Sequence, residues 1–255
     1  KVSDYGLHFS KLWFADMGFG LLLGAVLMGL IFLFELGMGW SSVTGFNQSH
    51  SEGVPFWIAF VVDIVVYISI GIYEELLFRG YQMRNLAEGF NHRRIGSQRA
   101  LIIALILSSI LFGLLHGINP NANWISTVNI VIAGLFLASG FIMTGELAIP
   151  IGLHISWNFF QGAVFGFPVS GISSVASIFE ISQTGPQLFT GGLFGPEAGL
   201  IGLISMGMGF VAILLWVNRD KKSTLLESGL AEYTRPGMIS QSNIIHDSSI
   251  QKFNS

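Results

Sequence analysis

Three short groups of polar residues stand inside segments that are otherwise apolar. They are, in chain order, Glu74, Glu75 and Arg79; Phe112 and His116; and His154 and Asn158. An ionisable side chain at the centre of a bilayer costs about 2.5–3.5 kcal/mol on insertion scales, so such residues usually face the interior of a helix bundle and mark function. These residues are therefore candidates for a buried catalytic or binding site.

The two adjacent glutamates of the first group cannot share one role. Neighbouring side chains on a helix point about 100° apart, so they face different surroundings. Glu75 and Arg79 are spaced i,i+4, which favours an ion pair along the helix. Glu74 is then free, and a carboxylate beside apolar walls can act as a general base. Taken alone, the motif fits equally well two interfacial acids and an arginine that reaches toward the lipid headgroups.

The histidines become informative in combination. His154 and Asn158 are spaced i,i+4 and lie on one helix face, where they could bind a metal ion or donate two hydrogen bonds to one oxygen atom. A lone histidine in a membrane segment is more often a structural hydrogen-bond partner, and His116 alone would carry little weight. Two such histidines, together with an acid and an amide, point to one shared site.

The chain that must position these residues has 255 residues, of which 51% are hydrophobic and 11% are charged, and its mean hydropathy is +0.64. A soluble domain carries about 25% charged residues, so a soluble globule is excluded. The net charge of −3 gives no reason to expect nucleic acid as a partner, and the absence of cysteine excludes disulfides, thiolate metal sites and a cysteine nucleophile.

Six stretches reach the roughly 20 apolar residues that a transmembrane helix needs. The sequence therefore predicts an all-α fold, a polytopic membrane helix bundle with about six transmembrane helices in this chain. The predicted spans are Met17–Leu36, Val54–Tyr73, Ala100–Ile118, Trp124–Thr144, Leu147–Phe167 and Ala198–Val217.

The distribution of Lys and Arg predicts the orientation of the chain. The six spans divide the polar segments into two alternating sets, and one set holds all 12 basic residues. Because cytoplasmic loops are enriched in Lys and Arg, we expect both ends of this chain in the cytoplasm and a multi-pass protein of the cell (plasma) membrane. The expected organisation is a single transmembrane domain at 1–222, with a motif-bearing core at 54–217, and a polar, flexible cytoplasmic tail at 223–255. The connection Pro168–Glu197 is expected to be a loop, in part re-entrant.

The three groups lie at unequal depths from the expected cytoplasmic boundary. Glu74 and His154 lie about 12–15 Å along their helices from that boundary, whereas His116 lies about 24 Å from it. For the three to meet, the helix that begins near Ala100 must project into the cytoplasm, tilt strongly or kink at Gly113.

In their order and spacing, these groups resemble the motifs of the CAAX-protease and bacteriocin-processing family of intramembrane proteases, also called the Abi family. Its motifs are two glutamates, three residues and arginine; an aromatic residue, three residues and histidine; and histidine, three residues and asparagine. The resemblance implies an all-helical membrane enzyme that acts on a peptide or protein substrate at the lipid bilayer, without nucleic acid. Bacterial relatives are associated with bacteriocin immunity and peptide processing. Members commonly have eight spans, which implies that two N-terminal spans are missing from this chain.

The resemblance and the residues together indicate an endopeptidase mechanism. Glu74, in the same motif as Glu75, would activate water with the help of His116, while His154 and Asn158 would stabilise the oxyanion. The catalytic candidates are Glu74, Glu75, His116, His154 and Asn158, with Arg79 and Phe112 in structural support. A Zn²⁺ ion held by Glu74, His116 and His154 is an equally open alternative, and no other cofactor is expected. The sequence contains neither Gly-x-Ser-x-Gly nor His-Glu-x-x-His, which disfavours a serine nucleophile and a single-helix zinc site.

Two other classes of function could use the same residues. A non-enzymatic membrane protein, such as an immunity factor, would sequester a peptide in the polar cavity. A transporter would relay protons through the Glu and His side chains. Transporters often show internal inverted repeats, and the sequence shows none.

Overall fold

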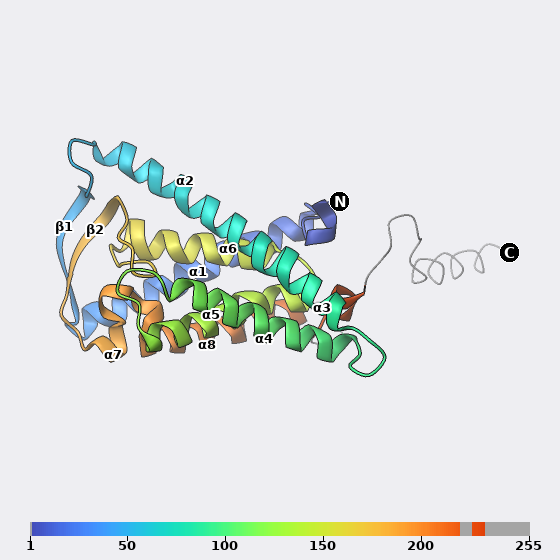
Figure 1. Ribbon diagram of the computed structural model, residues 1–255. Helices are drawn as coiled ribbons and strands as arrows, with labels where there is room; N and C mark the ends of the chain where they lie inside the picture. The colour runs from blue at the N-terminus through green and yellow to red at the C-terminus, as the bar shows by residue number, and fades with distance from the viewer. Residues whose placement is uncertain (1, 220–225, 233–255) are drawn as a thin grey trace.

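The computed structural model describes residues 2–219 and 226–232 and shows a bundle of membrane-length helices (Figure 1). Among the described residues, five helices are long and apolar enough to cross a membrane. They are α1 (Lys11–Gly37), the continuous helix Phe56–Phe90, α4 (Ser97–His116), α5 (Trp124–Thr144) and α8 (Leu200–Asn218). The prediction of an all-α, polytopic membrane helix bundle is confirmed.

The sixth predicted span is shorter than the sequence indicates and lies inside the bundle. It consists of α6 (Ala148–Phe159) and a π-helical turn at Phe160–Val164, and it ends before the predicted boundary at Phe167. All side chains of α6 from Ala148 to Asn158 are buried. An element that neighbouring helices cover on every side can be short, because it need not span the bilayer alone.

Glycines allow α1 and α6 to pack backbone against backbone. A Cβ atom added at Gly24 of α1 would lie 2.7 Å from the backbone nitrogen of Trp157 and 2.8 Å from the carbonyl oxygen of Leu153. Small residues at such contacts permit the close approach of membrane helices. The contact holds in place the helix that carries the third polar group.

The helix that carries the first polar group extends further than predicted. α2 (Phe56–Glu75) continues through a π-helical segment, Leu76–Met83, into α3 (Arg84–Phe90) without interruption. The predicted end of this span at Tyr73 is too early, because Arg79, further along the same helix, is still buried in the bundle with 1% of its surface exposed. π-Helical turns are frequent at functional sites, and this one directly follows the two glutamates.

A two-stranded antiparallel sheet covers one end of the bundle (Figure 1). It pairs β1 (Ser41–Ser49) with β2 (Ala176–Gln183), so that Phe46 lies opposite Phe179. The sequence analysis placed both segments in polar connections and did not predict the sheet. The expectation that Pro168–Glu197 is only a loop is therefore wrong for its central part.

Buried acids connect the sheet to the membrane helices. Asp63 of α2 accepts hydrogen bonds from the backbone nitrogens of Val175 and Ala176, at 3.2 and 2.8 Å. Glu35 of α1 accepts hydrogen bonds from Ser41 and Gln183, at 2.6 and 2.8 Å. The sheet is thereby fixed to two helices, and the connection that follows α6 is fixed with it.

The remaining described elements are short. They are α7 (Gln187–Thr190) and 3₁₀ turns at Val2–Tyr5, Gly192–Phe194, Pro196–Ala198 and Ser228–Ala231. The last turn falls in the predicted tail, and its Leu230 and Ala231 are buried. The rest of that tail, at 223–225 and 233–255, lies outside the described residues.

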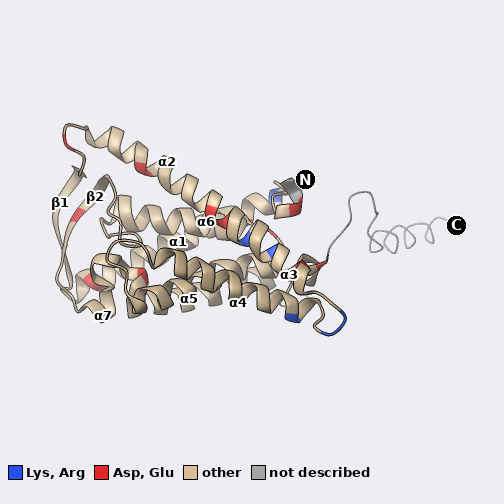
Figure 2. Cartoon of the chain, in the orientation of Figure 1, with Lys and Arg blue, Asp and Glu red and all other residues tan. Residues whose placement is uncertain are grey.

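The charged residues are distributed unevenly between the two ends of the bundle. In Figure 2 the blue segments of the cartoon, which mark Lys and Arg in the described part, lie toward the end that carries α3 and the first residues of the chain, away from β1 and β2. Acidic residues occur toward both ends. The separation that the sequence predicts for Lys and Arg is thus present along the bundle.

Candidate active site

A cavity of about 400 Å³ brings together residues from all three polar groups. Glu74, His116, His154 and Asn158 line it, with Phe112 beside them. The other lining residues are mainly apolar and come from α2, α4, α5, α6, α8 and the connection that follows α6. The cavity has the size and the composition of a ligand site, which is typically apolar with a few polar groups.

Glu74 is a buried carboxylate with one oxygen free. Its Oε1 accepts a hydrogen bond from the hydroxyl of Tyr73 at 3.0 Å. Its Oε2 is buried without a hydrogen-bond partner among the described residues and lies 3.9 Å from Nε2 of His154. Leaving a buried polar atom unpaired is costly. This oxygen is the one placed to contact water or a substrate in the cavity.

Glu75 lies behind the cavity and joins Arg79 to His154. Its Oε1 accepts hydrogen bonds from Nη1 of Arg79 at 2.8 Å and from Nδ1 of His154 at 2.7 Å. The ion pair expected from the i,i+4 spacing is present. The bond to His154 joins two helices and was not predicted. It sets the orientation of the imidazole ring, as carboxylate partners of histidines commonly do.

Arg79 and Phe112 support the site from behind. Besides its bond to Glu75, Arg79 donates from Nη2 to the carbonyl oxygen of Gly134 at 3.0 Å, and its guanidinium carbon lies 4.6 Å from the ring centroid of Phe112. The same phenyl ring has its centroid 4.5 Å from that of His116. Arg79 is thus held by α2, α4 and α5 together and does not line the cavity.

His116 is the last residue of α4. Its Nδ1 lies 2.8 Å from the carbonyl oxygen of Phe112. A carbonyl oxygen can only accept, so Nδ1 carries the proton, and Nε2 of the neutral ring is left as an acceptor. Asn158 lies one turn beyond His154 on α6, is buried, and lines the same cavity. The cavity therefore contains a carboxylate, an imidazole acceptor and an amide donor.

The residues that could hold zinc do not form a metal site in this arrangement. Among the described residues, no group of three His, Asp or Glu side chains is placed to hold a metal ion. Nδ1 of His116 is engaged by a carbonyl group and Nδ1 of His154 by Glu75, an arrangement that metal-bound histidines share, so these two hydrogen bonds do not decide the question. Because Glu74, His116 and His154 do not form such a group here, the zinc alternative stays a prediction, and the mechanism below includes no step at a metal.

Glu197 lines the cavity and was missed by the sequence analysis, which placed it at the end of a loop. It lies in the turn Pro196–Ala198 before α8 and is 4% exposed. Burial raises the pKa of this carboxyl group to about 7. The available signal was an isolated acid directly before an uncharged apolar span, but acids at span ends are usually solvated.

The comparison with known families tests the resemblance. Residues 55–160 match the family model described as type II CAAX prenyl endopeptidase Rce1-like. The resemblance to the CAAX-protease family is confirmed. The matched segment, 55–160, contains all seven residues of the three polar groups but not Glu197. No curated protein and no solved structure matches the chain significantly.

The match and the helices together support a coarse description of the molecule. Its long apolar helices are those of a multi-pass membrane protein, and its segment 55–160 is similar to CAAX proteases, a family that implies a peptide substrate and a lipid environment.

Proposed function

We propose that this protein is an intramembrane endopeptidase in which Glu74 activates the water that hydrolyses a peptide bond. The observation that carries the proposal is the free, buried Oε2 of Glu74 in a cavity that two histidines and an asparagine also line. A positioned base contributes typically 10²–10⁴-fold to such reactions, provided that it can reach the proton it removes.

The proposed proton transfers use two atoms in the cavity, Oε2 of Glu74 and Nε2 of His116. A water molecule between Glu74 and His116 would donate one hydrogen to Oε2 and the other to Nε2 of the histidine. As its oxygen attacks the peptide carbonyl carbon, the proton passes to Glu74. The protonated Glu74 then donates it to the leaving nitrogen, and the C–N bond breaks to give a carboxylic acid and an amine.

The negative charge that develops on the peptide oxygen must be stabilised by hydrogen-bond donors in the cavity. The side-chain amide of Asn158 supplies one N–H, and Nε2 of His154 supplies another when its ring is protonated. Glu75 balances that positive charge through Nδ1, at 2.7 Å. Removing one donor of this kind costs about 2.7–4 kcal/mol of transition-state stabilisation in comparable sites.

We also propose that the end of the bundle that carries α3 is cytoplasmic, together with the first residues of the chain. The gathering of the described Lys and Arg residues toward this end supports the orientation. The end covered by β1 and β2 would then face the opposite side of the membrane.

The test uses purified protein in vesicles with two probes, a farnesylated CAAX peptide and a library of internally quenched unmodified peptides. Wild-type protein should cleave at least one of them, and Glu74→Gln should lower the rate about 10³-fold because an amide cannot accept the proton. Glu52→Gln, an exposed acid outside the cavity, is the matched control and should retain the rate. Preincubation with a metal chelator should leave the wild-type rate unchanged.

Cleavage that survives in Glu74→Gln would contradict the assignment of the base. If wild-type protein cleaves no probe, and wild-type protein and Glu74→Gln bind a peptide equally well, sequestration rather than hydrolysis would be the function.

A further inference from the structure

Glu197 lies in the turn Pro196–Ala198 between α7 and α8, and Figure 1 shows α7 at the end of the bundle near the sheet. Its Oε1 accepts hydrogen bonds from the backbone nitrogen and the hydroxyl of Ser170, at 2.5 and 3.3 Å. Its Oε2 accepts a hydrogen bond from Nε2 of Gln161. Asn119 donates to the carbonyl oxygen of Ser170 at 3.0 Å. All of these partners are neutral, so the carboxylate has no counter-ion in its immediate contacts.

The cavity as a whole has an excess of acidic groups. Glu74 and Glu197 both line it, and none of the described lining residues is Lys or Arg. The nearby guanidinium of Arg79 does not line the cavity and contacts Glu75, a carbonyl oxygen and a phenyl ring. The two histidines that line the cavity are bound to Glu75 and to a backbone carbonyl group.

A buried carboxylate that neutral donors alone contact is energetically expensive. The raised pKa of Glu197, at about 7, has this burial as its largest cause. A cation entering the cavity would form a charge-assisted hydrogen bond, which is about twice as strong as a neutral one.

We propose that Glu197 forms a subsite for a cationic group of the peptide substrate, either a Lys or Arg side chain or an amino terminus. The proposal rests on the proposed function for its assumption that the ligand is a peptide. The same excess of acid disfavours an acidic side chain or a free carboxyl terminus in this part of the cavity. Glu197 would therefore contribute to the choice of substrate and not to the chemistry at Glu74.

The test measures binding, so that it does not depend on cleavage. Three libraries of fluorescent decapeptides built from Ala and Leu are compared. Every peptide carries one other residue, whose position varies within the library. That residue is Lys in the first library, norleucine in the second and Glu in the third. In an uncharged maltoside detergent, wild-type protein should bind the Lys library about 10-fold or more tightly than the norleucine library, and the Glu library least tightly. In Glu197→Gln the preference for Lys over norleucine should fall to within about 3-fold.

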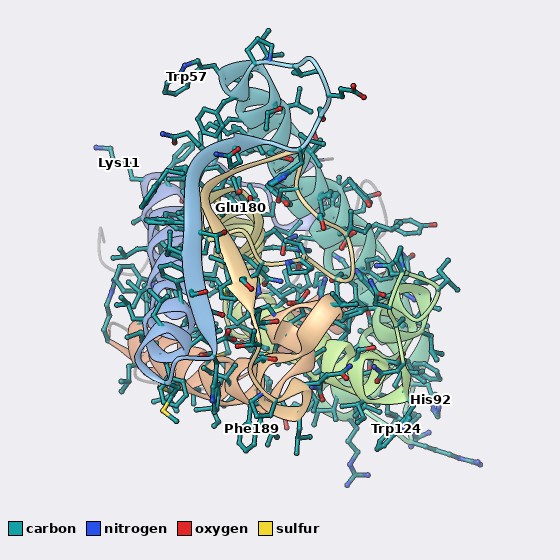
Figure 3. The ribbon with its side chains drawn as sticks, turned by 90° about the vertical axis from the view of Figure 1, so that its left-hand side faces the viewer. Lys11, Trp57, His92, Trp124, Glu180 and Phe189 are labelled. Atoms are coloured by element: carbon teal, nitrogen blue, oxygen red, sulfur yellow. The ribbon has the colours of Figure 1, made fainter. Side chains whose placement is uncertain are left out.

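Two further variants keep the result interpretable. Ile172 lines the cavity in the turn that Glu197 holds through Ser170, and it is 55% exposed. Ile172→Lys therefore places a cation beside Glu197 without removing a buried contact. This variant should lose the preference for Lys peptides. Glu180→Gln removes an acid of β2 that does not line the cavity, labelled in Figure 3, and should leave the preference intact.

Equal binding of Lys and norleucine peptides by wild-type protein would overturn the subsite. So would a preference for Lys that persists in both Glu197→Gln and Ile172→Lys. Failure of the proposed function would look different, because wild-type protein would then bind the Lys library selectively without cleaving it.

Discussion

Glu74 and Glu75 follow each other in the chain but contact different parts of the molecule. Each has one oxygen without a hydrogen-bond partner among the described residues, but Glu74 lines the cavity, whereas Glu75 lies behind it and binds Arg79 and His154 through Oε1. Helix geometry predicts that their roles differ. It does not predict the hydrogen bond between Glu75 and His154, since these two residues are 79 positions apart in sequence.

Replacing Glu75 with Gln should therefore reduce both stability and turnover. Breaking a buried ion pair from one side costs about 3–5 kcal/mol, and a neutral amide cannot balance a protonated His154. We expect a lower melting temperature and, for the folded fraction, a turnover number reduced about 10-fold or more with little change in KM. Thermal unfolding in detergent and steady-state kinetics would measure the two effects.

The matched control breaks another i,i+4 pair on the same continuous helix. Arg84 and Glu88 are joined at 3.1 Å but are partly exposed, so Glu88→Gln should cost less than about 1 kcal/mol and leave turnover unchanged. If Glu75→Gln lowers stability without any effect on the turnover of folded protein, Glu75 supports only the fold.

At the scale of elements, the long helix Phe56–Phe90 removes the expected mismatch in depth between Glu74 and His116. Glu74 lies about 24 Å along this helix from Phe90, and His116 about 28 Å along α4 from Ser97, so the two reach similar depths. α4 is continuous at Gly113, where a kink was one of the alternatives. A Cβ atom there would lie 2.9 Å from the carbonyl oxygen of Thr127, so this glycine serves close packing against α5.

The contact between α1 and α6 should be as important to the site as the site residues themselves. Gly24→Val would place side-chain atoms against the backbone of Trp157, where a Cβ atom already lies at 2.7 Å. Overpacking costs about 1–3 kcal/mol or more, and a displaced α6 would carry His154 with it. We expect a lower melting temperature and a loss of activity.

Gly29→Val on the same helix is the control, because a Cβ atom at Gly29 has no neighbour within 4 Å. Equal melting temperatures for the two valine variants would show that α1 and α6 can separate without consequence for the fold.

At the scale of the whole molecule, the sequence predicts those structural features that are determined by residues close together in the chain. The apolar spans and the i,i+4 pair of Glu75 and Arg79 belong to this class. The pairing of β1 with β2 and the burial of Glu197 depend on segments that lie far apart in sequence, and no local pattern identifies them. Val43 and Phe46 carry a weak strand signal, but the polar residues around them favour a loop.

The buried carboxyl group of Glu197 should also couple pH to the stability of the whole bundle. Burial raises its pKa from 4.5 to about 7. Below about pH 4.5 the group is protonated in both the folded and the unfolded chain. Between about 4.5 and 7 it ionises only when the chain unfolds, so folded protein loses stability as pH rises, and above about 7 this loss is complete. Glu146, whose pKa burial also raises, acts in the same direction.

Comparison with Glu197→Gln isolates the contribution of this group, because other titrating groups are shared by both proteins. The melting temperature of wild-type protein relative to the variant should fall from pH 4.5 to 7 and then stay level. The partly exposed acid Glu180 of β2 provides the control, since Glu180→Gln should follow the wild-type curve. A wild-type melting temperature that rises relative to Glu197→Gln over this range would mean that the carboxylate is stabilised in the folded state. In that case its contacts with Ser170 and Gln161 would outweigh its burial, and a cation would have little to add.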